Sequence, residues 1–256
     1  MNGEKSGRAL ILNADDCNLT RGVTEAILEC HQRGIVSSTT CLINMPLKER
    51  LLKKIASQKR LGLGLHLNIT LGAPVSPWRS VLSLLSADRQ FDRSLLNPCR
   101  FPKAGEVFRE YENQLCLFRK FFRRLPTHLD THHQLHDHRF YFAILYRLAR
   151  KYRLPIRRSW GVRIPGLGIR TSDHLFGGLG SKRGWSRGKF GRLLRTLPPG
   201  LTEVMCHPGK NDPDLKKASS MTAAREIECR IFRDPKWKRI LKQRGIFLTH
   251  YGLWYT

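Results

Sequence analysis

Two adjacent carboxylates follow a short apolar segment near the start of the chain. Residues 9–12 read Ala-Leu-Ile-Leu, and Asp15 and Asp16 come shortly after them. Adjacent carboxylates repel each other and resist burial, so their position at the end of a buried strand requires compensation. A cation, a hydrogen-bond network, or a division of work between a ligand and a base would supply it. Either aspartate taken alone is also typical of a turn or a helix cap.

The strongest chemical signal is a segment dense in histidine. Residues 127–138 read Thr-His-Leu-Asp-Thr-His-His-Gln-Leu-His-Asp-His. A solvated loop or adventitious metal binding would give a similar composition. However, apolar residues are interleaved in the segment, and it begins where a strand is expected to end. The segment therefore predicts a metal-binding or catalytic role.

Two further histidines lie in or directly after apolar segments. His66 lies within Leu-Gly-Leu-His-Leu at residues 63–67, and His207 follows Val-Met-Cys at residues 204–206. A lone histidine in a strand is more often a core residue than a ligand. Taken together, one or two carboxylates and two or more imidazoles form a ligand set for Zn²⁺, Mn²⁺, Fe²⁺ or Co²⁺. A cation with open coordination positions lowers the pKa of bound water, and a spare carboxylate then serves as the base.

These residues fall at the carboxyl ends of predicted strands. Strand-like segments at residues 8–13, 38–43, 61–69, 126–130, 155–158, 202–206 and 245–249 alternate with helix-like segments at residues 21–33, 47–58, 106–123, 138–152, 187–196, 221–232 and 235–243. In the segment 221–232, Ile227 and Ile231 recur at helical spacing. Residues 71–104 are predicted to be irregular, and the glycine-rich, basic residues 159–185 are predicted to form a mobile loop or lid.

The alternation predicts an α/β fold with a parallel sheet, closed into a barrel or partly open barrel of about seven strands. We expect one domain over residues 1–256. The carboxyl ends of parallel strands hold the active site in such folds, which predicts that the aspartates and histidines above converge there.

Composition limits the class of protein. Lysine and arginine total 46 against 20 acidic residues, giving a formal charge of +26. Such a charge predicts attraction to polyanions, although the cations are scattered and a generally basic surface explains them equally well. No apolar segment is long enough for a membrane-spanning helix, and the polar amino terminus favours a cytoplasmic protein. Seven cysteines without a C-x-x-C spacing favour reduced thiols.

The chain resembles the YdjC-type carbohydrate deacetylases. The matching segments are residues 12–16, 34–40, 64–67 with Thr70, Gly72 and Pro74, 126–133, and 203–209. Cys17-Asn18 stand where the family usually has Phe-Gly, and Gln134 stands where it often has a third consecutive histidine.

The resemblance implies a distorted (β/α) barrel and a role for each site residue. Asp16, His66 and His132 would bind one divalent metal ion, usually Mg²⁺, and the ligand chemistry would also accept Zn²⁺ or another transition metal. Asp15 would be the general base. His207 would stabilise the oxyanion or protonate the leaving amine.

The expected reaction is removal of an N-acetyl group from an amino sugar of an oligosaccharide or glycolipid, with a metal-bound water as nucleophile. Two alternatives stay open: a polyanion-binding protein on an inactive barrel, and a different metal-dependent amide or phosphoester hydrolase. The basic surface could contact an anionic polymer or a membrane surface, and a homo-oligomer is compatible with the sequence.

Overall fold

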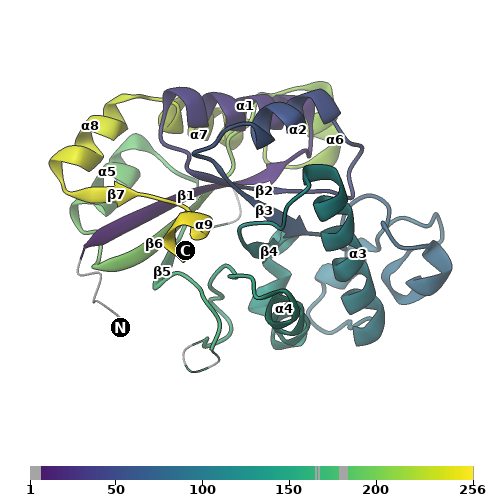
Figure 1. Cartoon of the computed structure of the whole chain (residues 1–256). Helices are drawn as coiled ribbons and strands as arrows, with labels where there is room; N and C mark the ends of the chain where they lie inside the picture. Colours follow the sequence, from purple (N-terminus) through teal and green to yellow (C-terminus); the bar gives the residue numbers. More distant parts are fainter. Residues whose placement is uncertain (1–6, 165, 167, 179–183, 256) are drawn as a thin grey trace. The chain divides into compact units, whose positions relative to one another are not determined.

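Seven strands form one sheet in the part of the chain that the structure describes. The computed structural model describes residues 7–164, 166, 168–178 and 184–255. The strands hydrogen-bond in the order β4-β3-β2-β1-β6-β5, and β7 also pairs with β1 (Figure 1). They are β1 (Arg8–Cys17), β2 (Ser38–Cys41), β3 (Gly62–Leu67), β4 (Leu129–Thr131), β5 (His174–Phe176), β6 (Gly200–Cys206) and β7 (Ile246–Leu248). The parallel sheet confirms the predicted α/β class, a partly open barrel of about seven strands.

Helices connect most of these strands, at the expected places. They are α1 (Arg21–Arg33), α2 (Glu49–Ala56), α3 (Ala104–Phe122), α4 (Arg139–Tyr152), α5 (Arg187–Arg195), α6 (Pro213–Ala218), α7 (Ala223–Phe232), α8 (Lys236–Gln243) and α9 (Tyr251–Trp254). The segment between β3 and α3 is mainly irregular, as predicted, and contains short 3-10 turns. Among the described residues, no helix has the length and apolarity needed to cross a membrane.

Three local expectations were wrong. Residues 155–158 contribute one isolated bridge, between Leu129 and Ile156, instead of a strand. The strand β5 lies inside residues 159–185, which the composition predicted to be a loop. The short helices α6 and α9 lie where the sequence predicts no element. Each of these elements is only a few residues long, too short for a recognisable apolar period. Residues 165, 167 and 179–183 of the predicted lid lie outside the described residues.

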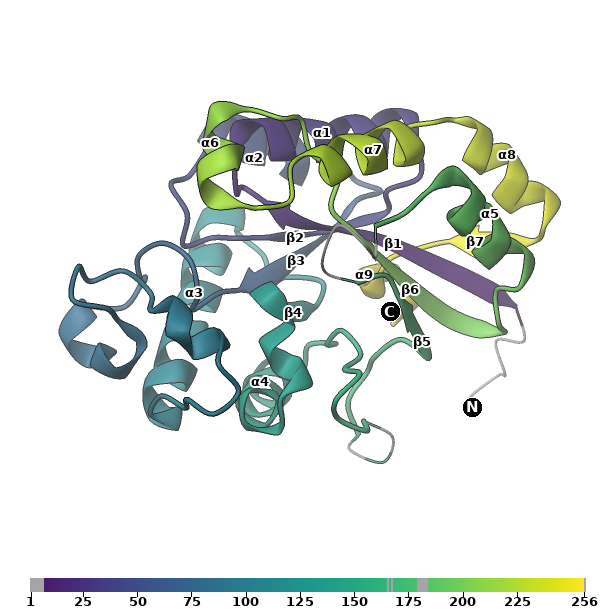
Figure 2. The same ribbon diagram turned by 180° about the vertical axis from the view of Figure 1, so that it is seen from behind.

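The chain forms two compact units. Unit 1 consists of residues 1–40, 48–62 and 172–256, and unit 2 consists of residues 41–47 and 63–171. The expectation of a single domain over residues 1–256 stays a prediction. In unit 1, β1 and β6 pair in parallel from Arg8 and Gly200 to Ala14 and Cys206. Helices α1 and α7 lie side by side over one face of these strands (Figures 1 and 2). In unit 2, β3 pairs with β4, and α3 packs on α4.

Local signals explain why α1 begins where it does. The side chain of Thr20 accepts a hydrogen bond from the backbone N–H of Val23, which is a standard helix N-cap. Asp212 reinforces this end, since its carboxylate accepts from the Gly22 N–H at 2.8 Å and from the Thr20 hydroxyl at 3.0 Å. A Cβ atom at residue 22 would lie 2.4 Å from that carboxylate, so glycine is required there. This helix follows directly on the strand that carries Asp15 and Asp16.

Candidate active site

The end of β1 directs the first of the two aspartates toward a histidine. Asp15 lies among the last three residues of β1 and is 2% exposed. One carboxylate oxygen accepts a hydrogen bond from the Asn13 side-chain amide at 2.8 Å. The other lies 3.9 Å from Nε2 of His207, which follows β6. The parallel pairing of β1 with β6 brings these two residues to the same edge of unit 1, as the sequence predicted.

The second aspartate has a different partner. Asp16 has a φ of 68°, in the left-handed region, and is 2% exposed. Its Oδ2 is 2.5 Å from a guanidinium nitrogen of Arg225, which is itself buried in α7. The sharp backbone turn therefore sends the two adjacent carboxylates to different partners. One lies beside an imidazole, and the other is fixed by a guanidinium.

The same helix also positions His207. The carboxylate of Glu228 accepts from the His207 backbone N–H at 2.6 Å and from the Trp185 N–H at 3.1 Å. Arg225 and Glu228 are three residues apart, so they share one face of α7. Both are buried, which is costly for charged groups unless they are paired. Their partners at the ends of β1 and β6 provide that pairing.

Unit 2 contains a buried chain of three charged or polar groups. Arg157 lies 2.9 Å from Oδ2 of Asp130, and Nδ1 of His66 lies 2.7 Å from Oδ1 of the same carboxylate. Arg157 and Asp130 are fully buried. Burial by itself raises the pKa of the Asp130 carboxyl. Electrostatic interactions with His66 and Arg157, together with the His66 hydrogen bond, outweigh burial, so this pKa lies below its ordinary value.

The ionised carboxylate of Asp130 fixes the orientation of the His66 ring. A carboxylate can only accept, so Nδ1 of His66 donates and Nε2 presents its lone pair. That Nε2 lies 3.3 Å from Nδ1 of His132. His132 opens the 3-10 turn at residues 132–137, within which His133 and Gln134 adopt left-handed φ values of 55° and 52°. The turn thus brings two imidazole nitrogens of unit 2 together.

The sequence predicted the residues with reactive side chains but not the residues that position them. All five predicted site residues, Asp15, Asp16, His66, His132 and His207, are buried. Within unit 1 the structure brings Asp15 and His207 together, and within unit 2 it brings His66 and His132 together. Sequence reasoning missed Arg225 and Glu228, and it gave no role to Asp130 or Arg157. Charged residues on the inward face of α7 were the one available signal.

Solved structures show the class of fold to which this arrangement belongs. A CE4 esterase from Streptococcus mutans is 14% identical and superposes with a TM-score of 0.55 over 96% of this chain and 87% of its own. At that identity the likeness shows the fold alone. A crystal structure described as a putative cellobiose-phosphate cleavage protein from Enterococcus faecalis V583 is 30% identical. It has a TM-score of 0.87 and covers 98% of this chain and 100% of its own.

Sequence comparisons then identify the family. The family model described as YdjC-like protein matches residues 9–243, so the chain belongs to the YdjC-like family. A relative from Geobacillus stearothermophilus, named carbohydrate deacetylase, is 34% identical over 97% of this chain and 98% of its own. A second relative with the same name, from Thermoanaerobacter pseudethanolicus, is 30% identical over 95% of this chain and 98% of its own. The resemblance read from the motifs is confirmed, and the chain is a hydrolase of the deacetylase class.

Proposed function

We propose that this protein is a metal-dependent enzyme that removes the N-acetyl group from an acetylated amino sugar, carried on an oligosaccharide or a glycolipid. The family supplies the class of reaction, since the curated relatives above are named carbohydrate deacetylase. The observation that carries the metal dependence is the pair of imidazole nitrogens of His66 and His132, 3.3 Å apart and supported by Asp130.

The proposed metal ligands are Asp16, His66 and His132. Each is buried, and each offers one ligand atom. The donor set fits a divalent cation, since it combines a carboxylate oxygen with two neutral imidazole nitrogens. Asp130 supports the fit, because a ligating histidine commonly donates its other ring N–H to a carboxylate. When bound, the cation would polarise the amide carbonyl and lower the pKa of water.

Asp15 and His207 carry the proton transfers in this proposal. Asp15 removes a proton from the attacking water as the general base. Its carboxylate is held for this role, since one oxygen lies 3.9 Å from His207 and the other accepts a hydrogen bond from the Asn13 amide. His207, whose Nε2 lies 3.9 Å from Asp15, protonates the leaving amine or stabilises the oxyanion. The buried positions of both residues exclude bulk water.

Metal content and turnover of three variants distinguish the proposed metal ligands from the proposed base. Asp15→Asn should retain the metal and lose about 10²–10⁴-fold in acetate release from N-acetylated oligosaccharides. Asp16→Asn and His132→Ala should lose the metal, measured by elemental analysis of the purified variants. A chelator should abolish acetate release by the native enzyme. Metal retained in all three variants would overturn the ligand assignment, and unchanged turnover of Asp15→Asn would overturn its role as base.

A further inference from the structure

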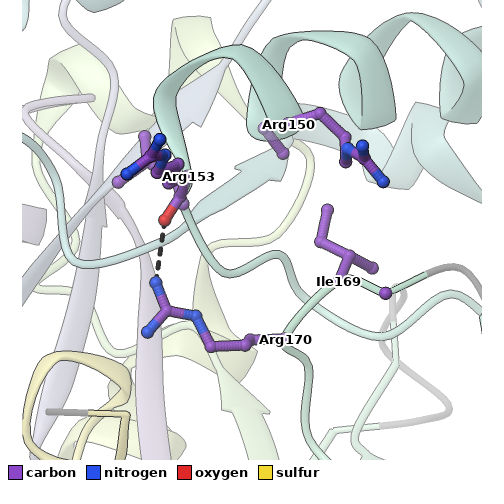
Figure 3. A pocket seen from close by; sticks show the side chains of 7 residues that line it. Arg150, Arg153, Ile169 and Arg170 are labelled. Carbon is purple, nitrogen blue, oxygen red and sulfur yellow. Dashed lines mark hydrogen bonds between the residues drawn. The ribbon is translucent and has the colours of Figure 1, made fainter.

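Unit 2 contains a polar pocket, lined by arginines, that the proposed reaction does not use. The pocket has a volume of about 270 Å³ and lies where α4 ends and the segment 168–170 passes by. Its lining residues are Ala149, Arg150, Arg153, Leu154, Gly168, Ile169 and Arg170. Figure 3 shows Arg150 and Arg153 coming from the end of α4, and Ile169 and Arg170 coming from the facing segment. Among the described residues, three arginines and no acidic side chain therefore line this small pocket.

The pocket lies far from the proposed metal ligands of unit 2. His132 precedes the amino end of α4, whereas the pocket lies at its carboxyl end. A helix of 14 residues spans about 20 Å at 1.5 Å per residue. The pocket is therefore separate from His66 and His132.

Structural roles explain these arginines only in part. Arg170 donates to the backbone carbonyl of Arg153 at 2.8 Å (Figure 3), which satisfies an acceptor at the end of α4. Arg150 lies in the last turn of α4, where a cation complements the helix dipole, and it contacts the Tyr146 hydroxyl. Within the described part of the chain, neither Arg150 nor Arg153 forms an ion pair with a carboxylate. Cations around one pocket repel one another unless an anion joins them.

We propose that this pocket binds a phosphate group. Guanidinium groups bind phosphate through paired, charge-assisted hydrogen bonds, and arginine is favoured over lysine where this geometry matters. A water occupies about 30 Å³ in the liquid, so 270 Å³ accommodates a phosphate with part of its hydration shell. The Arg153 carbonyl holds the Arg170 guanidinium at one side of the pocket, and Arg150 and Arg153 contribute the other two guanidinium groups of its lining.

The test measures binding of inorganic phosphate to the full chain by calorimetry. The native protein should bind one phosphate saturably. The double variant Arg150→Gln/Arg153→Asn should bind it at least tenfold more weakly; asparagine is chosen because Arg153 has a φ of 55°, which asparagine tolerates. The matched control is Arg119→Gln/Arg124→Gln, which removes the same charge from exposed positions of unit 2 outside the pocket. The control should bind within twofold of the native protein.

Two results would overturn the proposal: no saturable binding by the native protein, or equal weakening in the control pair, which would indicate general attraction to a basic surface.

A competition experiment identifies the source of the phosphate. Competition by phosphatidylcholine vesicles containing phosphatidic acid, lost in the double variant, would assign the pocket to a lipid headgroup. Phosphate binding without such competition would assign it to a soluble phosphate compound. Acetate release should be unchanged in the double variant, because the pocket lies outside the proposed catalytic residues.

Discussion

At the scale of single residues, neighbours in sequence have different partners. Asp15 is placed between the Asn13 amide and His207, while Asp16 is paired with Arg225. Asp16 departs from the conformation of a regular strand, in which the two side chains would point to opposite faces of the sheet, because its φ is 68°. Asp130 similarly joins two residues, Arg157 and His66, which no local motif connects.

Replacing Asp130 tests its support of His66. Asp130→Asn removes the carboxylate charge that lies 2.9 Å from the buried Arg157, so we expect a loss of about 3–5 kcal/mol in the free energy of unfolding. The affinity for the metal should fall about 10–100-fold, because His66 loses the carboxylate that orients it and raises its basicity. The measurements are chemical denaturation and calorimetric titration with Zn²⁺.

The double variant Asp130→Asn/Arg157→Met is the control for this prediction. It removes both charges, so it should recover part of the stability while its metal affinity stays low. Native metal affinity in the single variant would show that Asp130 serves packing alone.

At the scale of elements, the helices α1, α6 and α7 support the strand ends from outside the sheet. Asp212 is the N-cap of α6, and it also accepts hydrogen bonds from the first turn of α1. Arg225 and Glu228 lie on the buried face of α7 and reach Asp16 and the backbone of His207. The site therefore depends on helix ends and helix faces as much as on the strands.

The cap at Asp212 predicts a pH dependence of stability. Burial by itself raises the pKa of Asp212, but hydrogen bonds from Leu215, Gly22 and Thr20 outweigh burial, so the net shift is downward. A depressed carboxyl pKa stabilises the fold above the unfolded value, about 3.9, and this contribution is lost as the pH falls through the folded value. Asp212→Ala should lose about 1–2 kcal/mol near pH 7.

Asp212→Asn separates the cap from the charge in this prediction. Asparagine is a good N-cap but does not titrate, so we expect this variant to keep much of the stability near neutral pH. The difference in unfolding free energy between the native protein and this variant should shrink below about pH 4. Urea denaturation at several pH values measures it, and a difference that grows on acidification would contradict the expected sign.

The face of α7 predicts a selective loss of turnover. Glu228→Gln leaves one of the two backbone N–H groups, of His207 or Trp185, facing an amide nitrogen, which costs about 1–3 kcal/mol. Because His207 is displaced while the proposed ligands are untouched, kcat for acetate release should fall with metal content unchanged. The exposed Glu226→Gln on the same helix is the matched control and should leave kcat unchanged. Equal effects of the two variants would remove the assigned role of Glu228.

At the scale of the whole molecule, the dominant property is the formal charge of +26. Charge of one sign repels itself in the compact state and opposes folding. The chain nevertheless has a large apolar core, and most of its buried charged groups are paired.

This imbalance predicts stabilisation by salt. Raising NaCl from about 0.01 M to about 0.1 M shortens the Debye length from about 30 Å to about 10 Å, which screens the repulsion. Tm should therefore rise over this range, measured by calorimetry in a phosphate-free buffer so that the arginine pocket does not contribute. A Tm that is flat or falls would indicate that surface ion pairs outweigh net repulsion.

The sequence by itself determined the elements with strong local signals and the residues with reactive side chains. The helix α1 was predicted at its observed bounds, since Thr20 and Gly34 mark its ends by local hydrogen bonds. Asp15, Asp16, His66, His132 and His207 were found because such residues are unusual at the ends of apolar segments. Local chemistry is sufficient for both kinds of inference.

Only the tertiary structure decided how these residues are held. Asp16 and Arg225 are 209 positions apart, and Arg157 is paired with a carboxylate on a neighbouring strand. In α7, Ile227 proves to be 44% exposed, while Ile231 is buried together with Arg225 and Glu228, so the apolar spacing of Ile227 and Ile231 located the inward face only in part. A buried charge is tolerated only where folding brings it a partner, and no pattern along the chain specifies that partner. The reactive side chains can therefore be predicted from the sequence, whereas the groups that orient them are fixed by the packing of distant segments.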